Sequence, residues 1–113
     1  MSERFRPGMR IRRSAEFALV LKKGRKRRNR YFTLHILPAE GGCTRLGVVA
    51  SRNTGNAVGR NRAKRVLREA FRRLRSSLPP GLDLVAVVKS PLVKAKLQDV
   101  ERALRDAVGR RDG

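Results

Sequence analysis

The sequence predicts a single α+β domain, a sandwich in which helices cover most of one sheet. Its 113 residues are enough for one hydrophobic core but too few for two. Three stretches repeat apolar residues at helical spacing, and three others have the apolar pattern of strands. The expected order is helix, strand, strand, helix, strand, helix, with room for one further strand before the second helix.

The chain begins with a polar, basic segment, residues 1–13, which we expect to be an arm that orders only when bound. A first helix is expected over residues 14–23, with Ser14 as its N-cap and Gly24 as its end. Its apolar positions are Phe17, Val20 and Leu21. We therefore place the domain at residues 14–108, followed by a short tail at residues 109–113.

A strongly basic stretch follows this helix. Residues 22–30 contain seven Lys or Arg and no acid, and like-charge repulsion of this kind predicts a solvated loop. The next segment, residues 31–37, alternates apolar and polar side chains as a strand does. Its expected core face carries Phe32, Leu34 and Ile36, and its opposite face carries Tyr31, Thr33 and His35.

A second strand is expected at residues 45–51, after a turn at residues 38–42. We expect it to pair antiparallel with the first strand as a hairpin. A polar loop at residues 52–56 then leads to the next helix, and Gly55 in this loop is expected to need a positive φ.

The longest helical pattern covers residues 57–75, with Asn56 as the expected N-cap. One face of this helix is apolar and the remaining faces carry cations, so half of it should face the core and half the solvent. The apolar face is Ala63, Leu67, Ala70, Phe71 and Leu74, and the cations are Arg62, Arg65, Arg68, Arg72 and Arg73.

Two elements complete the pattern after a break at residues 79–81. Residues 82–89 are almost all apolar, which predicts a central strand that is buried on both faces. Residues 97–108 carry one apolar stripe and are expected to form a helix that covers the sheet. The stripe consists of Leu97, Val100, Leu104, Ala107 and Val108.

The charge of the chain points to a polyanionic partner. There are 29 Lys and Arg against 9 Asp and Glu, a formal net charge of +20. Self-repulsion of this size destabilises a free protein unless a polyanion relieves it. Arg outnumbers Lys by 22 to 7, which favours nucleic acid because guanidinium groups bind phosphate bidentately and stack on bases. A genome rich in G and C would also raise the Arg share, but it would not explain the excess of base over acid.

Cysteine and hydropathy indicate the compartment. Cys43 is the single cysteine, so no intramolecular disulfide can form. The N-terminus lacks the apolar core of a signal peptide, and no run of residues approaches the length needed to cross a bilayer. We expect a soluble, cytoplasmic protein that does not bind membranes.

Residues for protein-based nuclease chemistry are missing from the sequence pattern. Proton transfer or metal binding needs paired carboxylates, two histidines, or histidine and cysteine at ligand spacing, and none of these is present. Glu69 stands four residues from both Arg65 and Arg73, which favours a helix ion pair over catalysis. His35 is interpreted as an exposed strand imidazole and Cys43 as a turn residue, and we expect neither catalytic residues nor a protein-bound metal.

The segment GNAVGRNRAKRVLREAFRR, residues 55–73, carries the most specific pattern. It resembles the AVxRNRxKRxxRExFR signature of the bacterial ribonuclease P protein subunits. Eleven positions match, namely Ala57, Val58, Arg60, Asn61, Arg62, Lys64, Arg65, Arg68, Glu69, Phe71 and Arg72. The resemblance extends to Phe17, Val20 and Gly24 in the first helix and to the LGVVAS stretch before the signature.

This resemblance implies a fold and a division of labour. The fold it implies is a two-layer α/β sandwich with a mixed sheet, in which the signature helix connects parallel strands by a left-handed crossover, against the usual rule. It also implies that the catalytic site and its Mg²⁺ belong to an RNA subunit, and that the protein binds both this RNA and the 5′ leader of precursor tRNA. No obligate protein partner is expected.

Site residues follow from the same resemblance, position by position. The residues implied in binding the ribonuclease P RNA are Arg52, Asn56, Arg60, Asn61, Arg62, Lys64, Arg65, Arg68 and Arg72. The residues implied in binding the leader, in a cleft between the first helix and the sheet, are Phe17, Val20, Tyr31, Thr33 and His35. Unpaired bases stack on aromatic or imidazole rings, which suits such a cleft. Leu21 and His35 stand where relatives often have aromatic rings, so stacking should be weaker here. Phe17 also fits ordinary core packing, and beside a leader site the basic run at residues 22–30 also fits contact with leader phosphates.

Other functions share some of these features. A structural RNA-binding protein, such as a ribosomal component or RNA chaperone, would have the same charge and much of the same fold. Packaging of DNA would need a duplex-reading element or wedge residues, which the sequence lacks. Residues 57–75 have the amphipathic pattern of a membrane-surface helix, but their small apolar side chains suit packing on a sheet better.

Overall fold

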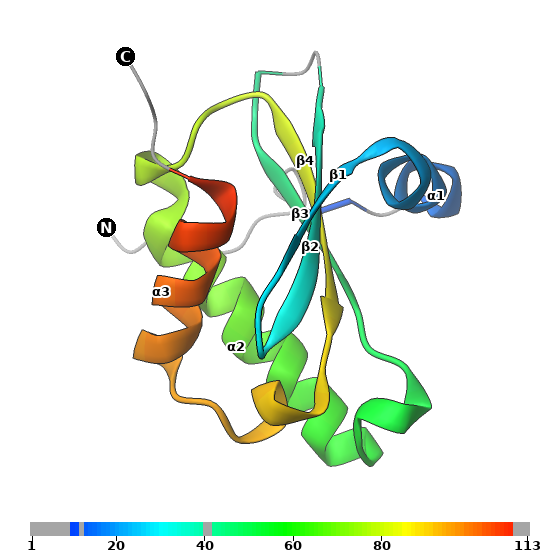
Figure 1. The fold of residues 1–113 in the computed structure, drawn as a ribbon, viewed down its shortest axis with the longest axis vertical. Helices are drawn as coiled ribbons and strands as arrows, with labels where there is room; N and C mark the ends of the chain where they lie inside the picture. Colours follow the sequence, from blue (N-terminus) through cyan, green and yellow to red (C-terminus); the bar gives the residue numbers. More distant parts are fainter. Residues whose placement is uncertain (1–9, 12, 40–41, 110–113) are drawn as a thin grey trace.

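The computed structural model describes residues 10–11, 13–39 and 42–109, and the fold is shown in Figure 1. The long elements, in chain order, are α1 (Ser14–Lys23), β1 (Arg25–Arg28), β2 (Phe32–Pro38), β3 (Arg45–Val49), α2 (Ala57–Leu74), β4 (Leu82–Val88) and α3 (Leu97–Val108). Three short 3₁₀ turns, η2 (Arg52–Thr54), η3 (Arg75–Ser77) and η4 (Ser90–Lys94), connect them.

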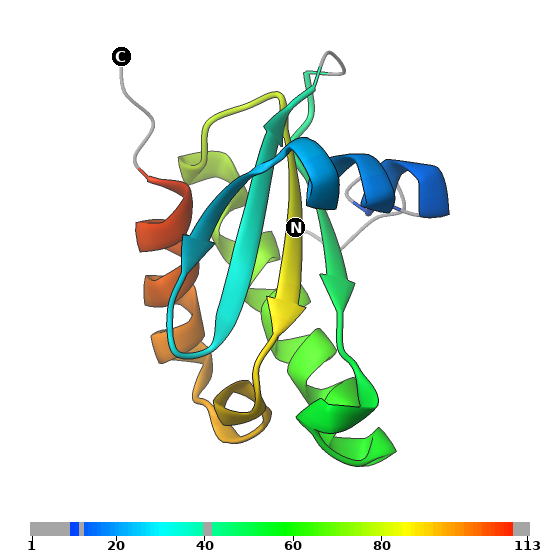
Figure 2. The same cartoon turned by 45° about the vertical axis from the view of Figure 1, so that its right-hand side comes forward.

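The four strands form one mixed sheet in the order β1-β2-β4-β3. β2 pairs antiparallel with both β1 and β4, whereas β3 pairs parallel with β4. α2 and α3 cover one face of this sheet, and α1 lies across one end of the opposite face (Figures 1 and 2). The connection from β3 through α2 to β4 is left-handed (Figure 2). The predicted fold class and the unusual crossover are therefore confirmed.

The expected loop at residues 22–30 is wrong, because Arg25–Arg28 forms the edge strand β1. All four of its side chains are exposed. Pairing with β2, with Arg25 opposite Ile36 and Arg28 opposite Thr33, gives this stretch its backbone hydrogen bonds. An edge strand tolerates four like charges because both the charges and one row of backbone groups remain in water.

The antiparallel hairpin expected between residues 31–37 and 45–51, which correspond to β2 and β3, is also wrong. β4 inserts between β2 and β3, so β2 and β3 are not neighbours in the sheet. The tight hairpin of the fold instead joins β1 to β2, and Asn29 closes it by accepting hydrogen bonds from the backbone N–H groups of Tyr31 (2.8 Å) and Phe32 (3.0 Å). Gly55 has φ 161°, which is extended backbone, so the expected positive φ is wrong there as well.

The main core lies between the sheet and the α2–α3 layer, as the apolar patterns predict. Phe32, Leu34 and Ile36 of β2 are buried there, together with the whole predicted apolar face of α2. β4 is the central strand, and five of its seven residues are buried. α3 has the predicted bounds and buries all of its predicted stripe except Leu97, which is partly buried.

The N-terminal segment is described only in part, since residues 1–9 and 12 lie outside the described residues. Arg10 forms a parallel bridge with Leu46 at the free edge of β3, and Ile11 is buried. These two residues of the expected arm thus pack on the sheet, and most of that segment lies outside the described residues. Ser14 is the first residue of α1 rather than its cap, which is Arg13 and makes no side-chain capping bond.

Candidate nucleic-acid interface

The face of the sheet opposite α2 and α3 is only partly covered. Strand register places His35, Val85 and Gly47 side by side in one row across β2, β4 and β3. α1 covers this row, with Val20 fully buried against Val85 and with Phe17 in the same small cluster. The next row, Arg28, Thr33, Val87 and Val49, lies beyond the helix. A strip of sheet therefore remains open beside α1.

Two features hold α1 in its position. A Cβ atom on Gly47 would lie 2.6 Å from Cε1 of Phe17, so the ring can lie on the strand only because this residue is glycine. Arg45 donates hydrogen bonds to both carboxylate oxygens of Asp83 (2.9 and 2.8 Å) and to Glu16 of α1 (3.1 Å). The hydrogen bond with Asp83 raises the pKa of Arg45 above its usual value. This ion-pair network connects the helix to β3 and β4.

The open strip forms a groove of about 400 Å³. Its floor comes from β2 and β4, and its rim is cationic. The lining residues are Lys26, Arg28, Thr33, His35, Val87 and Lys89. Lys26 and Arg28 are exposed, while Lys89 donates from Nζ to the backbone oxygen of Asn29 (2.7 Å) and so supports the hairpin. Three cations thus surround a short, partly apolar floor.

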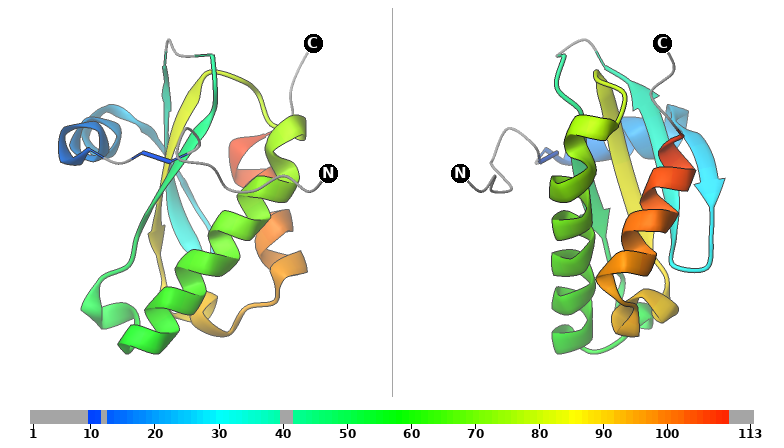
Figure 3. Two further views of the ribbon diagram at one scale, coloured as in Figure 1. Left: turned by 180° about the vertical axis from the view of Figure 1, so that it is seen from behind. Right: turned by 90° about the vertical axis from the view of Figure 1, so that its left-hand side faces the viewer.

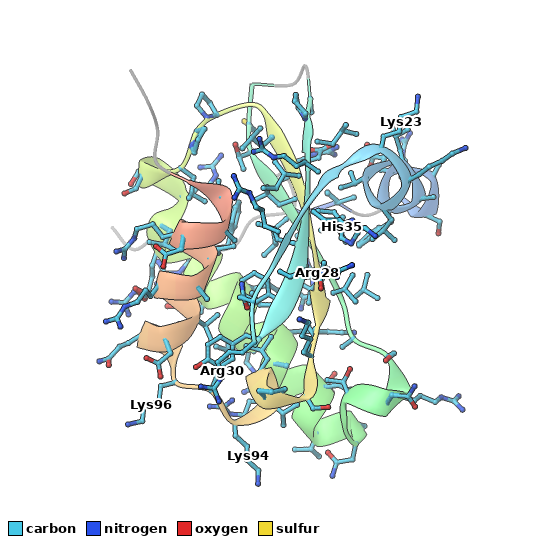
Figure 4. The ribbon with its side chains drawn as sticks, in the orientation of Figure 1. Lys23, Arg28, Arg30, His35, Lys94 and Lys96 are labelled. Carbon is cyan, nitrogen blue, oxygen red and sulfur yellow. The ribbon has the colours of Figure 1, made fainter. Side chains whose placement is uncertain are left out.

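His35 lies in this groove on the α1 side of the sheet, as Figure 4 shows. The residue is only 7% exposed, so the expectation of an exposed imidazole is wrong. Its Nδ1 atom is buried without a hydrogen-bond partner in the described structure. Burial, with a further contribution from the charges of Lys26 and Arg28, lowers the pKa of His35 below its ordinary value of 6.5. The ring is therefore neutral at pH 7 and keeps an unused polar atom.

Two of the five predicted leader residues, Thr33 and His35, line this groove. Phe17 and Val20 belong to α1 and pack on the sheet, Phe17 against Gly47 and Val20 in a cluster with Val85. Tyr31 is a correction, because it precedes β2, packs against the main core and lines a different pocket next to α3. The residue-by-residue prediction did not include Lys26, Arg28 and Lys89. The charge run at residues 22–30 was the available signal for the first two.

The second cationic surface is the outward side of α2, which runs along the edge of the helical layer in Figure 3. Asn61, Lys64, Arg65 and Arg68 recur at spacings of three and four residues and therefore share one side of the helix. Asn61 and Arg65 are exposed, while Lys64 and Arg68 are half-buried. Burial and the nearby charge of Arg10 lower the pKa of Arg68. An anion beside these two guanidinium groups would relieve their repulsion.

The start of α2 has the expected cap. Oδ1 of Asn56 accepts a hydrogen bond from the backbone N–H of Gly59 (2.8 Å), which confirms Asn56 as the N-cap. Arg52 is exposed in the turn η2 just before the helix, and Arg60 is half-buried in its first turn. Both predicted RNA-contacting positions thus lie at the same end of α2 as the cap.

Arg62 differs from the other cations of the signature. Its Nη1 donates to the backbone oxygen of Val93 (2.6 Å) and its Nη2 to that of Ala95 (3.0 Å). Both carbonyls belong to the segment around η4 that leads into α3. In this structure Arg62 therefore fastens α2 to that segment, and its guanidinium is not presented on the row formed by Asn61, Arg65 and Arg68.

Two acidic residues of the helical layer, Glu69 and Glu101, form ion pairs. Glu69 pairs with Arg72 (2.6 Å), so the predicted ion pair exists but with a different partner from Arg65 or Arg73. The hydrogen bond from Arg72 lowers the pKa of Glu69. Arg73 pairs instead with Glu101 of α3 (2.9 Å). The predicted RNA-contacting residue Arg72 thus has one acidic neighbour.

The described residues contain no group of three or more His, Cys, Asp or Glu side chains that could hold a metal ion. Within the same part of the chain, none of the helices combines the length and the apolarity that crossing a bilayer requires. What the two surfaces offer chemically is binding of an extended anion by cations, with one neutral imidazole in the groove.

Comparison with known proteins gives consistent matches. A model of the family described as Ribonuclease P matches residues 5–112. The ribonuclease P protein component of Shouchella clausii is 42% identical over 96 residues, covering 84% of this chain and 79% of the relative. That of Chloroflexus aggregans is 41% identical over 103 residues, covering 87% and 76%.

Solved structures agree. The RNase P protein from Thermotoga maritima has a TM-score of 0.80 at 31% identity and covers 92% of this chain and 98% of its own. The Staphylococcus aureus RNase P protein has a TM-score of 0.75 at 30% identity, with coverage of 88% and 91%.

The mixed sheet, the cationic groove and the basic face of α2 define a small nucleic-acid-binding protein of the α+β class. With the matches above, the chain belongs to the ribonuclease P protein family. This family supplies the protein component of ribonuclease P, so the chain is an RNA-binding protein of tRNA processing that has an RNA partner.

Proposed function

We propose that the outward side of α2 binds the RNA subunit of ribonuclease P and that the groove beside α1 binds the 5′ leader of precursor tRNA. Cleavage of the leader is then carried out by the RNA subunit and its Mg²⁺, in the cytoplasm. The observation that supports this most is the groove itself, in which the exposed cations Lys26 and Arg28 line the same cavity as His35.

The dimensions of the groove suit a single strand. Its floor spans the neighbouring strands β2 and β4, which lie roughly 5 Å apart. A volume of about 400 Å³ holds little more than one nucleotide. Unpaired bases can turn their faces and edges toward protein rings, whereas bases in a duplex cannot. Phosphates of the same strand would then contact the exposed cations of β1.

Recognition in the groove should depend little on base identity. The apolar floor residue Val87 offers contact area that every base can use. His35 adds an imidazole ring to the wall of the groove, although its Nδ1 atom is buried beneath that wall. The leader would therefore be held mainly by shape, stacking and charge.

Two sides of α2 have different roles in this proposal. Its outward row is free to contact the phosphates of folded RNA, while Arg62 on another side of the helix joins it to the rest of the helical layer. Holding two RNA molecules in fixed relation needs such a rigid connection, because a loose linkage would lose the entropic advantage of binding both.

The decisive experiment compares cleavage of precursor tRNA by the RNA subunit, by this chain and by both together at low Mg²⁺. We expect the chain alone to be inactive and the reconstituted complex to be active. Cleavage by the RNA-free protein would contradict the proposal. Co-purification with ribosomes and an unchanged rate of 5′ maturation would indicate instead a structural RNA-binding protein.

Variants test the groove separately. Lys26→Ala and Arg28→Ala should weaken binding of precursor tRNA by the reconstituted complex while leaving binding of mature tRNA unchanged. Each lost contact with a single strand should reduce the slope of log K against log salt by about 0.7. The control is Arg105→Ala, which removes one exposed cation from α3 outside the groove. Equal losses for precursor and mature tRNA would exclude leader binding here.

A further inference from the structure

A second pocket lies on the other side of the β1–β2 hairpin. It has a volume of about 390 Å³ and is bounded by the hairpin on one side and by α3 on the other. The hairpin contributes Arg27, Arg28, Asn29, Arg30 and Tyr31, and α3 contributes Asp99, Arg102, Ala103, Asp106 and Ala107. Arg28 is the one lining residue that this pocket shares with the leader groove.

The walls of this pocket carry opposite charges that do not meet. Asp99 and Asp106 lie seven residues apart on one side of α3, a separation of about 10 Å along the helix. In the described part of the chain neither carboxylate forms an ion pair, although the arginines of the hairpin line the same pocket. The pocket thus has two carboxylates without an ion pair beside Arg102 on the α3 wall, and donors on the hairpin wall.

An aromatic platform completes the pocket. The guanidinium of Arg30 lies over the Tyr31 ring, 5.2 Å from its centroid, so the two side chains form one cation–π pair against which a base can pack. The two hydrogen bonds that Oδ1 of Asn29 accepts fix the hairpin end that carries these residues. Arg30 lies at the same end of the molecule as Lys94 and Lys96, as Figure 4 shows, so phosphates near the pocket would meet further cations.

We propose that this pocket binds one unpaired guanine nucleotide of an RNA strand. Guanine presents two donors, N1–H and the N2 amino group, to a carboxylate, and two acceptors, O6 and N7, to arginine. Adenine would turn an unprotonated N1 toward the carboxylate, and pyrimidines offer a smaller face for stacking. Tyr31 and the acidic side of α3 then act in base selection, a role separate from that of the leader groove.

The direct test uses the full chain and three uridine pentanucleotides with guanosine, inosine or adenosine at the centre. Because the three have equal numbers of phosphates, non-specific attraction is the same for all. We expect fluorescence anisotropy to give affinities in the order guanosine, inosine, adenosine, since inosine lacks only the amino group. The affinities for the guanosine and adenosine pentamers should differ by about tenfold, because hydrogen bonds to a charged acceptor contribute a free energy of that size. Equal affinities would overturn the proposal.

The double variant Asp99→Asn/Asp106→Asn separates selection from charge. Removal of two negative charges should leave binding of the adenosine pentamer unchanged or tighter, while the preference for guanosine falls to less than about twofold. Attraction by charge alone predicts a uniform gain for all three pentamers and an unchanged preference, which would contradict the proposal. A thermal unfolding curve for each variant verifies that the fold is retained.

Three single variants locate the site. Arg102→Ala should weaken binding of all pentamers and Arg105→Ala should not, although both remove one exposed cation from α3. His35→Ala should leave the guanosine preference intact, because His35 lines the other cavity. Loss of the preference in the His35 variant would transfer base selection to the leader groove and overturn the assignment.

The guanine could come from the RNA subunit or from the substrate. With the reconstituted complex, the double variant would weaken assembly with the RNA subunit in the first case and binding of precursor tRNA in the second. Either result supports the site and identifies its source. An unchanged affinity for both RNAs would overturn the proposal, while leaving the leader groove untouched.

Discussion

Nη1 of Arg62 lies 2.6 Å from the backbone oxygen of Val93, a hydrogen bond that joins the first half of α2 to the segment leading into α3. The signature that carries the family resemblance therefore contains two kinds of arginine. Arg65 and Arg68 are presented for a partner, whereas Arg62 is engaged inside the protein. These residues are close in sequence, and only the structure separates their roles.

Arg62→Ala should lower the free energy of unfolding by about 2 kcal/mol, because two carbonyl groups lose a charged donor. Urea denaturation measures this loss. Arg62→Lys should recover only part of it, since an ammonium group cannot serve two carbonyls in the geometry of the guanidinium fork. A fully stable Ala variant would show that the hydrogen bonds from Arg62 to Val93 and Ala95 do not stabilise the fold.

Arg65→Ala should have the opposite effect, retaining stability and weakening RNA binding. Its side chain is exposed, so stability should change by less than about 0.5 kcal/mol. Affinity for the RNA subunit should fall, and the salt slope should decrease by about one unit for the lost phosphate contact. Filter binding across a series of salt concentrations measures the slope. An unchanged slope would argue against contact between this residue and the RNA.

Gly47→Ala should destabilise the protein by about 1 to 3 kcal/mol, because the added methyl group would overlap the ring of Phe17. Displacement of α1 would also alter the leader groove and reduce the preference for precursor over mature tRNA. Gly55→Ala is the matched control, since its Cβ would meet only Val93 at 3.7 Å and its backbone is extended. Thermal unfolding and tRNA binding of the two variants give the comparison.

Binding of the leader should become tighter as the pH falls from about 7.5 to 5.5. The pKa of His35 is lowered in the free protein by burial and by Lys26 and Arg28, and phosphates in the groove would raise it by offsetting those charges. Since binding then takes up a proton, affinity rises where the ring titrates. NMR titration of the His35 ring, with and without a leader oligonucleotide, measures both pKa values. Replacement by Asn should abolish this pH dependence.

The lowered pKa of His35 also determines how the stability of the free protein changes with pH. Because the folded state binds the proton on His35 less tightly than the unfolded state, the contribution of neutral His35 is complete above pH 6.5. It is lost as the pH falls through the lowered pKa. A stability profile of the RNA-free protein that rises toward acid pH in this range would contradict the assignment.

Local sequence patterns predicted the helices well. The bounds of α1 and α3 follow from apolar spacing, and the five buried residues of α2 were all expected. These features depend on neighbours three or four positions away, which the sequence displays directly. The strand β4 could likewise be recognised as central from its nearly continuous apolar composition.

Pairing between distant segments could not be predicted in the same way. Nothing local tells that Val85 stands between His35 and Gly47, because this depends on β4 entering the sheet after α2. β1 was missed because four consecutive cations lack the pattern of a strand. The segment is a strand because β2 provides the partners for its backbone hydrogen bonds, although its intrinsic β-propensity is low. Tyr31 was misplaced because strand alternation was extended one residue beyond the start of β2.

The two edge strands of the sheet, β1 and β3, differ in how their outer sides are covered, and this difference affects self-association of the free protein. The outer side of β3 is partly occupied by the bridge between Arg10 and Leu46. Among the described residues no strand pairs with the outer side of β1, which carries four consecutive cations, so two copies that approached strand to strand would bring eight like charges together. The cations that we propose to contact the leader would thereby also oppose self-association of the free protein.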